Sequence, residues 1–272
     1  MRQTGLVALI LAASAPRLAQ SATLCTIVMD ATTGRVLLEQ GDCRARVTPA
    51  STFKIPLAVM GFDSGVLTDA HAPVLSYKAG DPDWGGEAWR QPTDPTRWLK
   101  YSVVWYSQRI THALGEARVT AYARKLGFGN ADISGDPGRA NGLDRAWIAS
   151  SLQVSPYEQV VFLRRLVNHE LPVSAQAIAK AEDVVEVSPA AAGGGWQVHG
   201  KTDTAYPHDG SGVSDKAHAY GWYVGWATKG ARTLLVARLD QDERADPVPT
   251  GLRTRAALLA AWSATADAAA QP

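Results

Sequence analysis

The order of helix-like and strand-like patterns along this chain limits its fold more than any other feature. Strand-like segments lie near both ends of the sequence, and a long block with helical periodicity separates them. The predicted strands lie at residues 24–30, 35–40, 196–200, 220–228 and 232–240. This order predicts an α+β fold in which one antiparallel sheet, built from both chain ends, is flanked by helices in a three-layer α/β/α-like arrangement.

The middle of the chain supplies the inserted helices. Helix-like runs lie at residues 102–114, 118–126 and 156–168. A loop rich in Gly, Asp and Pro at 130–143 interrupts them, and an apolar, Ala-rich helix is predicted at 250–264. With 272 residues and 46% hydrophobic composition, the chain can bury a sizeable core. We expect a helical region over about residues 66–185 within a single domain at 22–272.

The N-terminal segment has the pattern of an export signal. Arg2 is followed by an apolar run at residues 6–15, and the small residues Ala19 and Ser21 form an A-x-A-like cleavage site. We therefore expect residues 1–21 to be a signal peptide and the mature protein to be secreted to the periplasm. The alternative is a buried N-terminal helix. No later run is apolar and long enough to predict a membrane span.

The two cysteines flank the first predicted hairpin. A turn at residues 32–34 folds the chain so that Cys25 comes roughly opposite Cys43. In an oxidising compartment the pair is expected to form a disulfide. Two free buried thiols remain the alternative, which only the export signal disfavours.

Charge and histidine placement exclude several classes of partner. Lys and Arg total 27 and Asp and Glu total 26, so the chain has no basic footprint for nucleic acid and no charge-based reason to bind a membrane. The six histidines are scattered, without H-x-H or H-E-x-x-H spacing, so no metal site is expected. The sequence does not determine the oligomeric state.

Ser51 and Lys54 form the first motif that could carry chemistry. Thr48 suits a helix N-cap and Pro49 the first helical position, which places the serine in the first turn. Positions i and i+3 share a helix face, so the hydroxyl and the amine can meet. The serine N–H has no intrahelical acceptor and can donate to an oxyanion. Pro56 is expected to kink this helix. Alone, the S-x-x-K motif also occurs in solvated first turns.

Three further short motifs follow along the chain. They are Tyr101-Ser102-Val103-Val104, Phe128-Gly129-Asn130 and Lys201-Thr202-Asp203. Each is commonplace alone, but in this order and spacing they resemble those of the class D (oxacillinase-type) serine β-lactamases. The resemblance runs from about residue 24 to 262 and includes Trp147 and the segments 150–152, 221–226 and 251–253. It implies a single β-lactamase/transpeptidase-like catalytic domain that acts on small-molecule β-lactams and confers β-lactam resistance.

The resemblance implies a set of roles around the lysine. Ser51 would be the nucleophile, and Lys54 would be carboxylated by CO₂ to N6-carboxylysine, the general base for acylation and deacylation. Burial favours the neutral amine that such a reaction needs. Trp147 would hold the carbamate through its indole N–H. Val104 and Leu152 would wall the lysine pocket. No cofactor besides CO₂ is implied.

The resemblance also implies roles toward the substrate. Ser102 would relay a proton to the leaving lactam nitrogen. Lys201 and Thr202 would lie near the substrate carboxylate, together with Arg253. The N–H groups of the nucleophile and of Thr204 would form the oxyanion hole.

The sequence departs from the class D pattern at two positions. Asp203 stands where Gly usually follows Lys-Thr. If its side chain points away from the site, as strand alternation would allow, little changes; if it points in, substrate affinity or range could suffer. Phe128 replaces the usual Tyr, which removes a hydroxyl but is not expected to remove the turn.

An absence in the sequence supports class D over class A β-lactamases. They use a glutamate in the loop after the third motif to activate water, and residues 131–157 contain none. Their Asn two residues after the second-motif serine is also missing, because position 104 is Val.

Three rival functions share part of the pattern. Residues 195–202 match G-x-x-x-x-G-K-[ST] literally, but a P-loop follows a strand and opens a helix, and neither is predicted here. A penicillin-binding transpeptidase and a β-lactam sensor share the S-x-x-K chemistry. Sensors are tethered by membrane helices, which the sequence does not predict, and both rivals would retain the acyl group instead of turning over.

Overall fold

The computed structural model describes residues 21–188, 194–208 and 213–269. Its strands form one antiparallel sheet in the order β2-β1-β6-β5-β4-β3. Their bounds are β1 Ser21–Asp30, β2 Val36–Gly41, β3 Val187–Ser188, β4 Gln197–Ala205, β5 Tyr220–Lys229 and β6 Arg232–Asp242. Because β6 pairs with both β1 and β5, the two chain ends build one sheet, as predicted.

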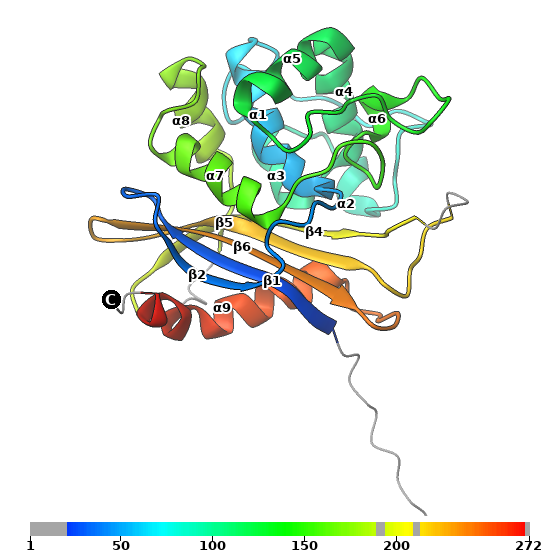
Figure 1. The fold of residues 1–272 in the computed structure, drawn as a ribbon. Helices are drawn as coiled ribbons and strands as arrows, with labels where there is room; N and C mark the ends of the chain where they lie inside the picture. The colour runs from blue at the N-terminus through cyan, green and yellow to red at the C-terminus, as the bar shows by residue number, and fades with distance from the viewer. Residues whose placement is uncertain (1–20, 189–193, 209–212, 270–272) are drawn as a thin grey trace, which may run out of the picture.

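Helices cover both faces of this sheet (Figure 1). The 3-10 helix η1 (Ala50–Phe53) leads into α1, and the helices continue to α9. Their bounds are α1 Lys54–Asp63, α2 Glu87–Arg90, α3 Pro95–Tyr101, α4 Val104–Leu114, α5 Glu116–Leu126, α6 Gly142–Arg145, α7 Pro156–Val167, α8 Ala175–Asp183 and α9 Thr250–Ala268. The block α1–α8 lies on one face and α9 on the other, which confirms the predicted α+β, three-layer class.

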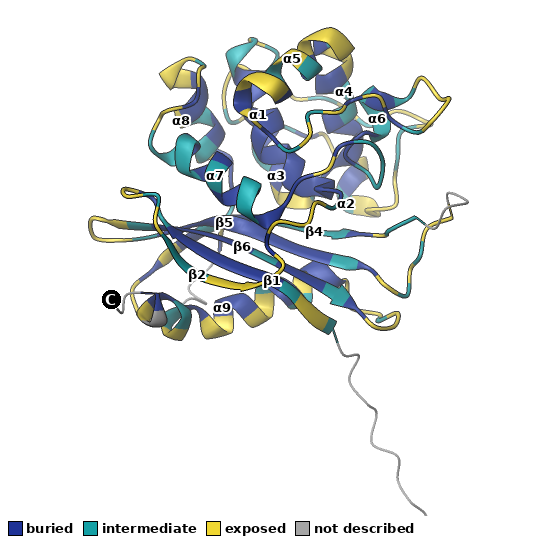
Figure 2. Cartoon of the chain, viewed as in Figure 1, coloured by how far each residue is buried: buried dark blue, intermediate teal, exposed yellow. Residues whose placement is uncertain are grey.

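Strand alternation divides the buried side chains between two apolar layers. Along β1, Ile27 packs toward the helical block, whereas Val28 packs toward α9. Along β6, Leu235 and Leu234 divide in the same way. Figure 2 shows the central strands buried along most of their length. Both faces are covered, so buried residues follow one another without a break along β1, β5 and β6, at residues 25–29, 221–227 and 234–237.

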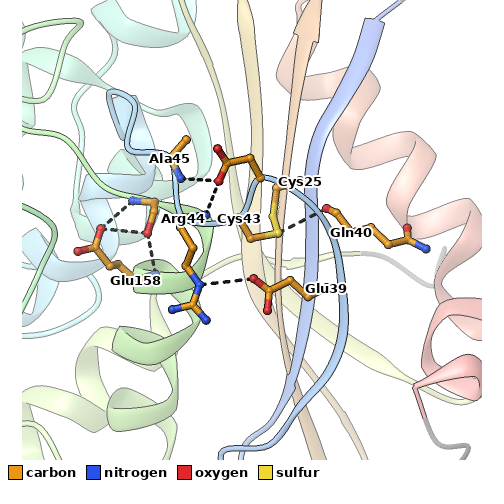
Figure 3. The surroundings of a disulfide bond; sticks show 9 residues. Cys25, Glu39, Gln40, Cys43, Arg44, Ala45 and Glu158 are labelled. Atoms are coloured by element: carbon orange, nitrogen blue, oxygen red, sulfur yellow. Dashed lines mark hydrogen bonds and ion pairs between the residues drawn. A yellow bond between two sulfur atoms is a disulfide. The ribbon is translucent and has the colours of Figure 1, made fainter.

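The N-terminal hairpin has the predicted turn. Gly34 N–H donates to the Asp30 carbonyl at 2.9 Å, and the Thr33 N–H donates to the Asp30 carboxylate at 2.8 Å. Gly34 has φ +70°, a conformation that glycine adopts without strain. Cys25 pairs with Gly41 across the hairpin, and the disulfide joins Cys25 to Cys43 (Figure 3). The predicted disulfide is therefore present, and both cysteines are buried.

Removal of this disulfide is expected to destabilise the fold measurably. It closes a loop of sequence separation 18, for which chain entropy predicts about 3 kcal/mol. The Cys25→Ser/Cys43→Ser variant should therefore unfold at lower denaturant concentration than the oxidised wild type. Wild type treated with a reductant is the matched control and should behave like the variant. Equal stability of oxidised and reduced wild type would contradict the expectation.

Several segments differ from the sequence-based prediction. The strand predicted at 196–200 extends to Ala205, and α3 and α8 were not predicted as separate helices. Residues 1–20, which hold nearly all of the predicted signal peptide, lie outside the described residues. Within residues 21–188, 194–208 and 213–269, no helix is both long and apolar enough to cross a bilayer.

Candidate active site

Ser51 and Lys54 meet as the i, i+3 spacing predicted, but through a different helix type. Ser51 lies in η1 and Lys54 is the first residue of α1. A 3-10 helix has three residues per turn, so side chains at i and i+3 eclipse one another. The Lys54 Nζ donates to the Ser51 Oγ at 2.7 Å. Pro56 falls in the first turn of α1, where its missing N–H costs least, so its position there does not require the predicted kink.

Thr48 is not an N-cap, contrary to the prediction. No side chain caps η1, whose preceding residue is Pro49 in a helical conformation. The Thr48 hydroxyl instead donates to the Trp147 carbonyl at 2.9 Å and accepts from the Ala149 N–H at 2.9 Å. The Thr48 carbonyl accepts from the indole N–H of Trp222 on β5 at 3.0 Å. Thr48 thus fixes the serine segment to both the Trp147 loop and the sheet. No sequence motif signalled this role.

A second buried contact ties the serine turn to the helical block. The Thr52 hydroxyl donates to the Pro49 carbonyl at 2.7 Å and accepts from the Gln159 side-chain amide of α7 at 2.7 Å. Thr52 and Gln159 are almost fully buried, so each polar group is satisfied within the protein. The turn that carries Ser51 is therefore rigidly held.

The environment of Lys54 favours its neutral form. Its side chain is completely buried, and this burial lowers the pKa of Lys54 from 10.5 to about 7. The positive charge of Lys201 lowers that pKa further, whereas the negative charge of Asp203 raises it. A substantial fraction of amine near neutral pH can therefore accept a proton from Ser51, whose residue surface is 5% exposed.

Trp147 presents an unpaired indole N–H inside this region. Its ring is buried and stacks on Phe53, the residue before Lys54, at a centroid distance of 5.5 Å. Among the described residues, the Trp147 Nε1 has no hydrogen-bond partner. A buried donor without an acceptor is costly. Val104 and Leu152, the other residues predicted near the lysine, are buried in the same apolar layer.

Ser102 occupies the junction between α3 and α4. It ends α3 in the left-handed conformation, with φ +59°, which is unusual for a residue other than glycine. Its hydroxyl is buried and has no hydrogen-bond partner among the described residues. Strained backbone and an unsatisfied hydroxyl together are typical of a functional position.

The Phe128-Gly129-Asn130 motif braces the loop that carries Trp147. The Asn130 side-chain amide donates to the Ser151 carbonyl at 2.8 Å, and its oxygen accepts from the Gln153 N–H at 3.0 Å. Gly129 has φ +54°, and a Cβ there would lie 2.1 Å from the Gln153 carbonyl oxygen. Phe128 is buried 5.8 Å from the Phe53 ring. The turn is retained without the hydroxyl, as expected.

Lys201 and Asp203 lie on the same face of β4. Val198 packs in the apolar layer beneath α9, so residues 199, 201 and 203 alternate to the opposite face, toward the helical block. On β5, Lys201 pairs with Val224 and Asp203 pairs with Trp222. Both partners pack in the apolar layer between the sheet and the helical block. Because Lys201-Thr202 lies within a strand and the next element among the described residues is the strand β5, the P-loop interpretation is excluded.

The Asp203 carboxylate points into the site. Its Oδ2 accepts a hydrogen bond from the Ser51 N–H, the group predicted to bind an oxyanion. Of the two orientations considered from the sequence, the inward one is therefore observed. Strand alternation does not turn Asp203 away, because position 203 shares a face with position 201. Counting two residues from Lys201 would have given this result.

Lys201 itself is buried and has few partners. Its Nζ donates to the Thr202 carbonyl at 2.7 Å. Burial lowers the pKa of Lys201, while the negative charges of Asp203 and Glu186 oppose that change and Arg255 adds to it. A buried cation beside the nucleophile can hold an anionic group of a ligand.

The side chains of three residues predicted to contact the substrate make other contacts in the structure. Thr202 pairs with Tyr223 on the face beneath α9, and the Thr204 hydroxyl accepts from the Gly251 N–H at 2.9 Å. The Arg253 guanidinium is bound by the buried Asp242 carboxylate. Arg253 is thus committed to a structural ion pair instead of being free for a substrate carboxylate.

The chain that carries this serine–lysine site is similar to known proteins. The model of the penicillin binding protein transpeptidase domain matches residues 24–261. The chain is 42% identical to β-lactamase OXA-9 from Klebsiella pneumoniae over 236 residues, which cover 86% of this chain and 85% of that protein. It is 32% identical to β-lactamase OXA-1 from Escherichia coli over 79% of this chain and 75% of that protein.

Solved structures agree with the sequence relatives. The class D β-lactamase OXA-427 superposes with a TM-score of 0.83 and 43% identity, covering 90% of this chain and 99% of that one. The C-terminal domain of the Bacillus licheniformis BlaR penicillin receptor shares the fold, with a TM-score of 0.72 at 22% identity, covering 91% of each chain. The chain belongs to the penicillin-binding transpeptidase-domain family and, within it, to the class D β-lactamases.

Proposed function

We propose that this protein hydrolyses β-lactam antibiotics through an acyl-enzyme on Ser51 and thereby confers resistance to them. One observation carries the proposal: a fully buried lysine, with its pKa lowered to about 7, lies 2.7 Å from the serine hydroxyl. The named relatives are β-lactamases, which supports the same substrate class.

The residues divide the chemistry as follows. The neutral Lys54 amine orients and deprotonates Ser51, whose Oγ attacks the lactam carbonyl carbon. The C–N bond of the ring then breaks, and the ring nitrogen takes up a proton, for which the unpaired Ser102 hydroxyl is the proposed relay. Water subsequently cleaves the ester to release the opened product and restore the serine. Lys201 is the proposed partner of the substrate carboxylate.

The site also fits carboxylation of Lys54. A neutral amine is the species that attacks CO₂, and the unpaired Trp147 indole N–H is a donor for the resulting carbamate. When formed, the carbamate supplies an oxygen base for both half-reactions. The absence of glutamate from residues 131–157 leaves no class A type base in that loop.

The remaining sequence-based assignments stay proposals. The Thr204 N–H is proposed as the second oxyanion donor and Thr202 as a carboxylate contact. Arg253 could join them only by leaving Asp242, so we rank it last among the substrate contacts. We also propose export to the periplasm through residues 1–21, and no nucleic-acid partner.

Steady-state hydrolysis of nitrocefin tests the proposal. After degassing, the activity is expected to be low, and added bicarbonate should restore sustained turnover well beyond one equivalent. Ser51→Ala is the control and should show neither turnover nor covalent labelling by mass spectrometry. A burst of one equivalent without turnover would reject hydrolysis as the function.

Such a burst would favour a β-lactam sensor or a transpeptidase. The fold shared with the BlaR receptor domain supports the first, and the matched transpeptidase-domain model supports the second. Either protein would keep the acyl group on Ser51, so the mass of the labelled protein would remain raised for hours.

A further inference from the structure

We propose that Asp203 is a specificity-determining residue whose carboxylate occupies the oxyanion position of the free enzyme and must be displaced by the substrate carbonyl. The inference rests on the proposed function, because it names the substrates that the same site disfavours. Those are β-lactams and analogues with additional negative charge near the reacting carbonyl.

The hydrogen bond between Asp203 and Ser51 carries this inference. The Ser51 N–H lies in a first helical turn and has no partner within its helix, so it is the natural donor to an oxygen that gains charge. In the structure that donor is already bound to the Asp203 Oδ2. A carboxylate accepts such a bond more strongly than a neutral carbonyl does.

The charges around Asp203 explain why its carboxylate stays in the site. Lys54 of α1 and Lys201 of β4 are both buried, and each interacts electrostatically with Asp203. A buried lysine cation without an anion would be costly. The carboxylate therefore compensates the charge of Lys201 in the absence of an anionic ligand, as a substrate carboxylate would when bound.

The backbone holds Asp203 in this place. Asp203 pairs with Trp222 of β5, and Gly251 of α9 packs so closely that a Cβ there would lie 2.1 Å from the Asp203 carbonyl oxygen. The main chain consequently has little room to retreat. For a substrate carbonyl to reach the Ser51 N–H, the Asp203 side chain must rotate away. Its negative charge then remains close to the bound substrate and disfavours substrates that are themselves negatively charged there.

Binding of arylboronic acids tests the inference without requiring β-lactam turnover. A boronic acid adds to the Ser51 Oγ and places a boronate oxygen where the lactam oxyanion would form. Asp203→Gly should bind phenylboronic acid about 10-fold or more tightly than wild type, the range expected for loss of a charge-assisted competitor. Asp203→Asn, similar in shape but neutral, should gain part of this affinity.

Charge dependence separates this role from a merely structural one. For 4-carboxyphenylboronic acid, the gain in both variants should exceed that for neutral phenylboronic acid. With nitrocefin, Asp203→Gly should lower KM more than it raises kcat. Asp267→Asn is the control, because it removes the same negative charge at an exposed position of α9. It should alter none of these values.

The outcomes distinguish the two proposals. Unchanged boronic-acid affinity in folded Asp203→Asn and Asp203→Gly would overturn the role of Asp203. Tighter boronic-acid binding in a protein that never turns over nitrocefin would support that role while rejecting hydrolysis. If Asp203→Gly unfolds, Asp203→Asn alone still decides, because it must bind the charged boronic acid more tightly than wild type.

Discussion

Lys54→Met is expected to reduce nitrocefin turnover by about 10³-fold or more and at the same time to stabilise the folded protein. Loss of the group that deprotonates Ser51 removes general-base catalysis, which typically contributes 10²- to 10⁴-fold. Methionine has a similar length but carries no charge and is readily buried. Activity and stability should therefore change in opposite directions at this one position.

The stability gain follows from the perturbed pKa. A fall in the pKa of Lys54 from 10.5 to about 7 corresponds to about 5 kcal/mol by linkage. Below pH 7 the folded wild type carries the full cost of a buried ammonium. Between pH 7 and 10.5 the unfolded chain binds the proton and the folded chain does not, so wild-type stability rises with pH. The advantage of Lys54→Met should accordingly shrink across this window.

Urea unfolding in CO₂-depleted buffer between pH 6 and 10.5 measures this effect. The difference in unfolding free energy between Lys54→Met and wild type isolates Lys54, because the other titrating groups are common to both proteins. Lys216→Met, a change at an exposed lysine, is the matched control and should show a small difference at every pH. A pH-independent gap for Lys54→Met would contradict the buried neutral amine.

Trp147→Phe is expected to slow deacylation by about 10- to 100-fold and to raise the bicarbonate concentration needed for half-maximal activity. Phenylalanine keeps an aromatic ring against Phe53 but removes the only polar donor of the side chain. A hydrogen bond to a charged group is worth about 1.5–3 kcal/mol, which sets this range. Acylation should suffer less, so the acyl-enzyme should accumulate.

Rapid-quench mass spectrometry and bicarbonate titration separate these effects. The control is Trp262→Phe, because the Trp262 indole N–H is also buried without a partner among the described residues but belongs to α9, on the opposite side of the sheet from Trp147. Trp262→Phe should leave the bicarbonate requirement unchanged. Equal bicarbonate dependence in wild type and Trp147→Phe would remove Trp147 from the proposed carbamate site.

Local patterns were sufficient to predict much of this protein. Periodicity predicted every strand of the sheet except the two-residue β3, together with the construction of the sheet from both chain ends, and the i, i+3 spacing of Ser51 and Lys54 predicted their contact. The hairpin turn correctly predicted that Cys25 could reach Cys43. Each of these results depends on residues that are close in sequence or on a simple repeat.

Tertiary contacts account for what the sequence did not reveal. Thr48 was interpreted as a local cap, but its hydroxyl is taken by the Trp147 loop about a hundred residues away. Arg253 was assigned to substrate by resemblance, but the buried Asp242 binds it. The orientation of Asp203 was decided by its register relative to Lys201. Propensity at one position cannot anticipate such distant partners.

The position of β6 has a consequence for the biogenesis of the enzyme. This strand lies between β1 and β5, so the centre of the sheet cannot close until residues 232–242 are available. A nascent chain would hold the Ser51 segment without its final support until nearly all of the polypeptide has emerged. Such long-range closure makes folding comparatively slow.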